Sequence, residues 1–287
     1  MYILDTSAIR GISSEKLRLA ATKVKIAVST LTVLELASHL NDSSDETSYL
    51  RARGNLIKCQ IPILLDDPFW LLSQKLQSSS NPTRRDDKVV LSQLIAAAEQ
   101  SQSLEELGAK SLAFPDGSVV SCLNIGERIG EILKDEEDSF VSHIQSLPAL
   151  AHLDPALNGK HRLISVTLFG QLTAATQSLS PMKDWNLQAK TFLATAPYFG
   201  YLTHRLYHYA NCRSPGETML PIDRNDCEDA YISLNLDLYK GDTLVTNDKG
   251  TLAALRNTLT LLNEILPTPL TSSYVMTNDE FLIAVEP

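Results

Sequence analysis

The stretch from Asn225 to Gly250 reads NDCEDAYISLNLDLYKGDTLVTNDKG, and it indicates more about the fold than any other. It opens with acidic residues and continues through apolar ones that predict a helix up to about Tyr239. Gly241 is expected to end that helix in a left-handed conformation. Thr243 to Asn247 predict a short buried strand, and Asp248 follows at its end. Because ligands bind beyond the carboxyl ends of strands in open parallel sheets, Asp248 is expected at a functional edge.

The amino-terminal stretch repeats this arrangement. Met1 to Leu4 predict an apolar strand that leads directly into Asp5. Lys25 to Ser29 predict a second strand, and residues 30–40 predict a helix in which Glu35 is the only charged residue. A charge among apolar side chains is costly unless it is paired or bound to metal, so Glu35 is a candidate functional residue.

The remaining elements favour an α/β fold with a parallel sheet covered by helices on both faces. Further strands are expected at residues 61–65 and 274–277, and further helices at residues 13–22 and 47–59, with a final turn at 279–284. Asp66 and Asp67 look like acids at the start of another helix.

Between these two parts the chain changes character. The run SSSNPTRR, residues 78–85, has the composition of a linker, and the residues after it show helical periodicity with almost no strand signal. We therefore expect a discontinuous domain formed by residues 1–77 and 216–287, with residues 78–215 as an all-α insertion. Helices are expected there near residues 86–108, 119–147, 160–180 and 184–211.

The net charge of −9 is unevenly distributed. Residues 78–215 hold 12 Lys and Arg against 14 Asp and Glu, and the rest of the chain holds 13 against 20. The acidity therefore lies in the part that carries the carboxylates singled out above. Such a chain lacks the basic face of a strong non-specific nucleic-acid binder, although a bound divalent cation would offset some of the charge.

Composition also limits the class of protein. Hydrophobic residues make up 44% of the chain and charged residues 21%, which is typical of a globular protein. No apolar run approaches the ~20 residues of a membrane helix, so we expect no membrane association. The four cysteines form no C-x-x-C pair, which argues against a zinc site or a disulfide framework and favours a cytoplasmic location. They are Cys59, Cys122, Cys212 and Cys227.

Four acids occur in order on the expected elements, and a fifth lies one helical turn before the third. Their settings are DTS after a strand, a glutamate in an apolar helix, D-A-Y-I at a helix start, and T-N-D after a strand. This combination resembles the PIN domain, a metal-dependent nuclease fold common among the ribonuclease toxins of bacterial toxin–antitoxin pairs. The resemblance covers residues 1 to about 77 and about 216 to 287. The acids are Asp5, Glu35, Asp229 and Asp248, with Asp226 as the fifth.

Carboxylates that converge in one site raise each other's pKa and cannot all stay ionised without a cation. Oxygen-only ligands favour Mg²⁺ or Mn²⁺ over zinc. The resemblance implies that Asp5, Glu35, Asp229 and Asp248 are catalytic, and that the same four together with Asp226 are candidate metal ligands. It also implies that hydroxyl and amide side chains hold the carboxylates in place, namely Thr6, Ser7, Thr246 and Asn247. Arg10 and Lys249, each near a candidate ligand, are candidate substrate-binding residues.

Plainer interpretations of the same residues remain open. Asp5 and Asp248 also suit strand-ending turns, and Asp226 and Asp229 also suit the negative charge that a helix start favours. Tyr201 lies in an aromatic and histidine stripe at helical spacing, which is more typical of packing than of base stacking.

The resemblance implies a hydrolase, a Mg²⁺- or Mn²⁺-dependent nuclease, with RNA as the favoured substrate and an inhibitor protein or a second copy of the chain as further partners. The alternative is a PIN-fold scaffold protein without catalytic activity. A phosphatase acting on small phosphoesters is a weaker alternative, because no Asp-x-Asp pair follows the first strand.

Overall fold

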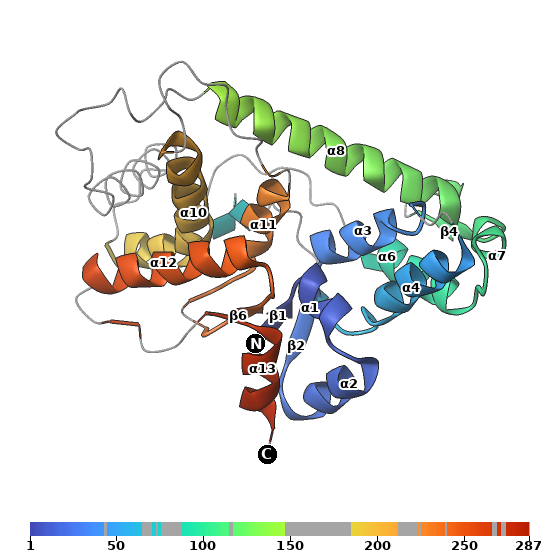
Figure 1. Ribbon diagram of the computed structural model, residues 1–287, viewed down its shortest axis with the longest axis horizontal. Coiled ribbons are helices and arrows are strands. Elements are labelled where there is room, and N and C mark those ends of the chain that lie inside the picture. The colour runs from blue at the N-terminus through green and yellow to red at the C-terminus, as the bar shows by residue number, and fades with distance from the viewer. Residues whose placement is uncertain are drawn as a thin grey trace.

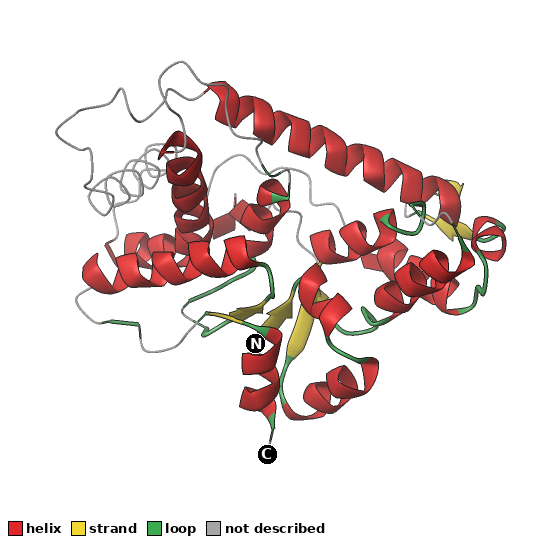
Figure 2. Ribbon diagram, viewed as in Figure 1, coloured by secondary structure: helices red, strands yellow, loops and turns green. Residues whose placement is uncertain are grey.

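The computed structural model describes residues 1–42, 45–64, 71–72, 74–75, 88–114, 117–146, 185–211, 223, 225–238, 240–265, 269–270 and 274–286. These residues form an α/β fold in which a parallel sheet lies among helices (Figure 1, Figure 2). Across the described residues, no helix combines the length and the apolar character that a membrane span requires.

The main sheet has five parallel strands in the order β3-β2-β1-β6-β7. All five were expected from the sequence, and the parallel sheet flanked by helices is confirmed. The strands are shorter than the apolar runs that predict them, because only their central residues pair. Their bounds are β1 Tyr2–Leu4, β2 Ile26–Ser29, β3 Ile63–Leu64, β6 Thr243–Val245 and β7 Val275–Met276.

Each face of the sheet packs on its own set of helices. Side chains alternate between the two faces along a strand, so neighbouring residues enter different cores. Leu4 and Val245 belong to a buried cluster with residues of α1 (Thr6–Gly11), α3 (Thr30–Ser38) and α8 (Cys122–Ser146), among other helices. Ile3 and Leu244 belong to a second cluster with residues of α10 (Trp185–Asn211), α11 (Asp226–Ser233) and α12 (Lys249–Ile265). The central strands are therefore buried on both faces, as their apolar sequences predict.

Three of the helices before the third strand and at the end of the chain start at polar caps that the sequence predicted, whereas α1 was not predicted. Ser13, Ser29 and Thr277 each accept a hydrogen bond from a backbone N–H of the first turn. The helices in these parts are α1 Thr6–Gly11, α2 Ser14–Lys23, α3 Thr30–Ser38, α4 Glu46–Ile57 and α13 Asn278–Val285.

The described part of residues 78–215 is mainly helical, but it also contains a hairpin that the sequence analysis did not predict. Strands β4 Ser111–Ala113 and β5 Val119–Ser121 pair antiparallel, with Gly117 at a φ of 83° in the connection. The expectation of an all-α segment is therefore not confirmed. The helices here are α6 Lys88–Glu99, α7 Leu104–Gly108, α8 Cys122–Ser146 and α10 Trp185–Asn211, and the helix expected at 160–180 lies outside the described residues.

These helices share buried clusters with the strands of the main sheet. Leu91 of α6 and Ile129 of α8 share the buried cluster of Leu4, and Tyr201 of α10 shares the cluster of Ile3. Figure 1 shows α8 running past α3 and α11, and both helices contact it. The described helices of residues 78–215 thus extend the two cores of the sheet.

Two helices after residue 225 differ from the sequence-based expectation. Helix α11, Asp226–Ser233, ends six residues before Tyr239. Gly241 has a φ of 67°, as expected for a left-handed glycine. The apolar residues from 232 to 238 occur at every second position, which no helix can place on one face. Helix α12, Lys249–Ile265, was not predicted from the sequence.

Candidate functional site

The two strands that precede Asp5 and Asp248 lie side by side in the sheet. β1 and β6 pair in parallel with Leu4 opposite Val245, and the Asp5 N–H donates to the Val245 carbonyl at 3.2 Å. The segments that follow both strands therefore leave the same edge of the sheet. This edge is where the sequence analysis expected the acids to gather.

Asp5 begins helix α1 and is only 4% exposed. One of its oxygens accepts from the Ala8 N–H at 2.7 Å and from the Ser7 hydroxyl at 2.9 Å. Burial raises the pKa of Asp5, and the negative charge of Asp248 acts in the same direction, while hydrogen bonds from Thr246, Ala8 and Ser7 oppose the rise. Ser7 and Thr246 therefore both donate hydrogen bonds to the Asp5 carboxylate.

Glu35 projects from α3 toward the start of α1. Its Oε2 accepts a hydrogen bond from the Thr6 hydroxyl, and Nη2 of Arg10 lies 3.9 Å from its Oε1. Burial raises the pKa of Glu35 despite the contributions of Thr6 and Arg10, and the charge of Asp5 raises it further. Arg10 thus interacts with a candidate ligand, and its side chain is 42% exposed.

Asp229 lies on α11 and receives two hydroxyl groups on the same oxygen. Thr251 donates to its Oδ2 at 2.5 Å, and the Tyr201 hydroxyl lies 3.3 Å from that atom. Burial raises the pKa of Asp229 well above its usual value, and the negative charges of Asp248, Asp5 and Asp226 raise it further. Because charges act strongly only at short range, these acids share one electrostatic environment.

Asp248 caps the amino end of α12. Its Oδ1 accepts from the Thr251 N–H at 2.6 Å, and its own N–H donates to the Thr246 hydroxyl at 3.0 Å. Asp248 and Lys249 are both exposed, so this end of the site faces solvent. Asn247 is also exposed. Its N–H donates to the Ser7 hydroxyl at 2.7 Å, while its side-chain oxygen accepts from the Asn278 N–H. The hydrogen bonds of Asn247 thus link α1 to α13.

Asp226 has a different environment from the one expected of a metal ligand. Its Oδ2 forms a 2.7 Å ion pair with Arg205 and also accepts from the Tyr209 hydroxyl, while its Oδ1 accepts from Tyr201 at 3.0 Å. Burial alone would lower the pKa of Arg205, because it disfavours the charged form. The Asp226 carboxylate acts in the opposite direction through its charge and its hydrogen bond, and the Arg205 pKa is raised. Both oxygens of Asp226 are therefore already bound by protein groups.

The donor chemistry of the remaining acids suits a hard divalent cation. Among the described residues, Oδ1 of Asp229 and Oδ2 of Asp248 accept no hydrogen bond, and the acids repel one another. However, no three His, Cys, Asp or Glu side chains of the described residues are grouped closely enough to hold a metal ion. A cation at this edge would therefore require the carboxylates to move closer together.

Four residues that lie near the candidate acids were not predicted from the sequence to be part of this site. Glu228 was not a candidate in the sequence analysis, but it is buried, and its pKa is raised to about 8 by burial and by the charges of Glu35 and Glu137. Thr251 follows Asp248 by three residues, a spacing typical of a capped helix start. Tyr201 and Arg205 come from α10, and only the fold brings that helix to the acids.

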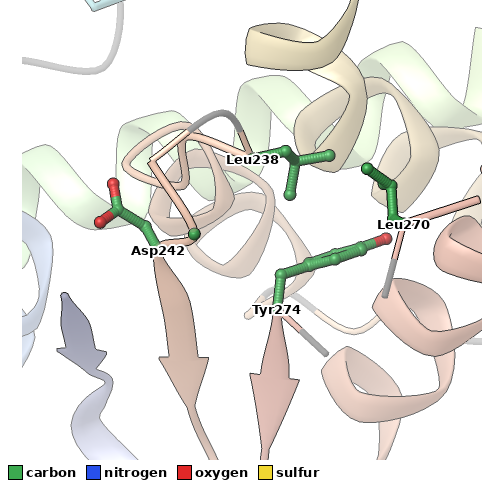
Figure 3. Close-up of a pocket in the computed structure, with 5 residues that line it drawn as sticks. Leu238, Asp242, Leu270 and Tyr274 are labelled. Atoms are coloured by element: carbon green, nitrogen blue, oxygen red, sulfur yellow. The ribbon is translucent and has the colours of Figure 1, made fainter. Parts of the chain in front are cut away.

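A small hollow elsewhere on the molecule is separate from these acids. It lies at the amino ends of β6 and β7, next to Asp242 and Tyr274, with Leu238 and Leu270 beside them (Figure 3). The candidate acids lie beyond the opposite, carboxyl ends of the strands. The hollow therefore forms no part of the candidate site.

Comparisons of the chain with protein-family models, with curated proteins and with solved structures found no match.

Proposed function

We propose that this protein is a Mg²⁺- or Mn²⁺-dependent nuclease with a PIN-like fold, and that RNA is its substrate. The observation that carries the proposal is the environment of Asp229. The anionic form of this partly buried acid is destabilised by the charges of Asp5 and Asp248, which follow two neighbouring strands. Mutual repulsion of this kind is typical of a site that gains a cation when it functions.

The protein groups would hold the cation through carboxylate oxygens of Asp5, Asp229 and Asp248, with Glu35 beside them. A bound Mg²⁺ or Mn²⁺ supplies an activated water and stabilises the negative charge that develops on the phosphate. The protein supplies orientation through hydroxyl groups that already fix one side of each buried carboxylate. These hydroxyl groups belong to Thr6, Ser7, Thr246 and Thr251.

Two cationic side chains are placed to attract a phosphodiester. Lys249 is exposed directly after Asp248, and Arg10 is partly exposed beside Glu35. Both lie on the solvent side of the acid-bearing edge, which suits a backbone phosphate that approaches from outside. Hydrolysis would leave a 5′ phosphate and a 3′ hydroxyl.

The proposal is tested by incubating single-stranded RNA and DNA with the protein in Mn²⁺, in Mg²⁺ and in EDTA. Wild type is compared with Asp229→Asn and with a control, Asp279→Asn, which changes an exposed aspartate on α13. We expect wild type and the control to cut RNA with metal and not with EDTA, and Asp229→Asn to be inactive. Equal cleavage by Asp229→Asn would reject the assigned site.

The second candidate is a scaffold protein of the same fold without catalytic activity. The acidic balance of the chain favours it, since the net charge is −9 and a polyanionic substrate would be repelled. The two candidates differ in the effect of metal on stability. A nuclease site should gain stability on addition of Mn²⁺, whereas a scaffold without a metal site should show the same melting temperature with and without it.

A further inference from the structure

Helix α10 directs one row of side chains toward the acids of α11. Tyr201, Arg205 and Tyr209 are separated by four residues each, so they lie on the same face of the helix. This face packs against α11 and α12. A segment that precedes Asp226 in sequence thus supplies side chains to the acids of α11.

The ion pair of Arg205 and Asp226 is almost completely buried. Their side chains are 12% and 5% exposed, and the pair is completed by Tyr209, whose hydroxyl accepts from Nη2 of Arg205 at 3.0 Å. A buried pair of this kind costs stability unless its remaining lone pairs are satisfied. Here Oδ1 of Asp226 is satisfied by the hydroxyl of Tyr201.

Tyr201 joins this pair to the candidate site. Its side chain is completely buried, and its hydroxyl oxygen lies 3.0 Å from Asp226 and 3.3 Å from Asp229. A phenol carries a single proton, so Tyr201 cannot donate fully to both carboxylates at once. The ion pair fixes Asp226, Asp226 fixes the hydroxyl, and the hydroxyl limits where Oδ2 of Asp229 can lie.

Thr251 limits the same oxygen from the other side. Thr251 and Tyr201 both contact Oδ2 of Asp229. The other oxygen, Oδ1, accepts no hydrogen bond among the described residues. A ligand carboxylate that is anchored through one oxygen and open at the other is oriented before its cation binds.

We propose that Tyr201, held in place by Asp226 and Arg205, is a positioning residue that orients Asp229 for cation binding. This inference rests on the proposed metal site. In this arrangement Asp226 holds Tyr201 in place and is not itself a metal ligand. Arg205 and the two tyrosines already occupy both of its oxygens.

The test measures Mn²⁺ affinity of the full chain by isothermal titration calorimetry. We expect Tyr201→Phe, which removes only the hydroxyl, to weaken Mn²⁺ binding about 10-fold, as is usual for the loss of a group that orients a metal ligand. The control is Tyr274→Phe, which removes another buried and hydrogen-bonded hydroxyl from the same core cluster without touching an acid. Tyr274→Phe should change the Mn²⁺ affinity by less than about twofold. Without metal, it should lower the free energy of unfolding by about as much as Tyr201→Phe does.

A double-mutant cycle separates support from direct ligation. If Asp226 acts through the Tyr201 hydroxyl, Asp226→Asn should also weaken Mn²⁺ binding, and the double variant should be no weaker than Tyr201→Phe alone. Additive losses would overturn the inference, because they would make Asp226 an independent ligand. Asp226→Asn also provides the test by itself if Tyr201→Phe does not fold, since unchanged Mn²⁺ affinity in Asp226→Asn would overturn the inference.

The remaining outcomes distinguish this inference from the proposed function. Wild-type affinity in Tyr201→Phe, with metal-dependent cleavage intact, would overturn the positioning role and leave the nuclease proposal standing. A wild-type protein that neither binds Mn²⁺ nor cleaves would overturn both.

Discussion

Thr251 donates its side-chain hydroxyl to Oδ2 of Asp229 at 2.5 Å, and so connects the first turn of α12 to α11. The backbone N–H of the same residue donates to Oδ1 of Asp248 at 2.6 Å. One residue therefore contacts two acids that belong to different elements. It fixes their separation more directly than the sheet does, because it touches both.

Removal of this hydroxyl should weaken the proposed metal site. Thr251→Val keeps the shape of the side chain and the backbone N–H, but leaves Oδ2 of Asp229 with Tyr201 alone. We expect Mn²⁺ affinity to fall about 10-fold, measured by isothermal titration calorimetry. Thr251→Ser retains a hydroxyl and should stay within about threefold of wild type. Unchanged affinity in Thr251→Val would show that Thr251 does not orient Asp229.

The stability of the protein should depend on pH through Glu228. Its pKa is raised to about 8 in the folded protein, so the folded state holds this proton at pH values where the unfolded chain has released it. The resulting stabilisation is complete below the unfolded pKa and is lost as pH rises toward about 8.

We therefore expect the free energy of unfolding to fall between about pH 5 and pH 9, by at most about 3 to 5 kcal/mol from this group. Glu228→Gln cannot ionise and should be less sensitive to pH over this range. Urea unfolding at several pH values measures the difference, with Glu131→Gln, an exposed change on α8, as the control. A wild-type-like pH profile in Glu228→Gln would contradict the assignment.

The stability of the protein should depend on the left-handed backbone conformation of Gly241, in the turn before β6. A methyl group there would meet no atom within 4 Å, so its cost comes from the backbone alone. We expect Gly241→Ala to destabilise the protein by about 1 kcal/mol. Gly130→Ala, in helix α8 with equally open space, should stabilise it by about 0.5 to 1 kcal/mol, because alanine favours helix. Chemical denaturation of both variants checks the opposite signs.

Lys249 should contribute to binding of a nucleic-acid backbone and not to metal binding. If it contacts a phosphate, Lys249→Ala should weaken RNA binding equally across sequences and reduce the salt dependence of binding by about one unit of slope. Mn²⁺ affinity should remain within about twofold of wild type, since the side chain carries no ligand atom for a cation. Lys16→Ala, an exposed change on α2, is the control. An unchanged salt slope in Lys249→Ala would place the substrate elsewhere.

The strands and most caps follow from local sequence. Apolar runs before Asp5 and Asp248 predict β1 and β6, because such short runs suit central strands buried on both faces. Ser29 and Thr277 predict their helix starts, because a hydroxyl there satisfies a free backbone N–H. Helix α12 was missed although Asp248 caps it, since the same residues also read as a turn.

What each carboxylate contacts depends on segments that are distant in sequence. Register between β1 and β6 places Asp5 beside Thr246, and the packing of α10 supplies Arg205 to Asp226 and Tyr201 to Asp229. The sequence by itself determined which elements carry acids, because strand and helix signals are local. The tertiary structure alone decided which acids repel one another and which are bound by the protein, because burial and pairing depend on contacts between distant segments.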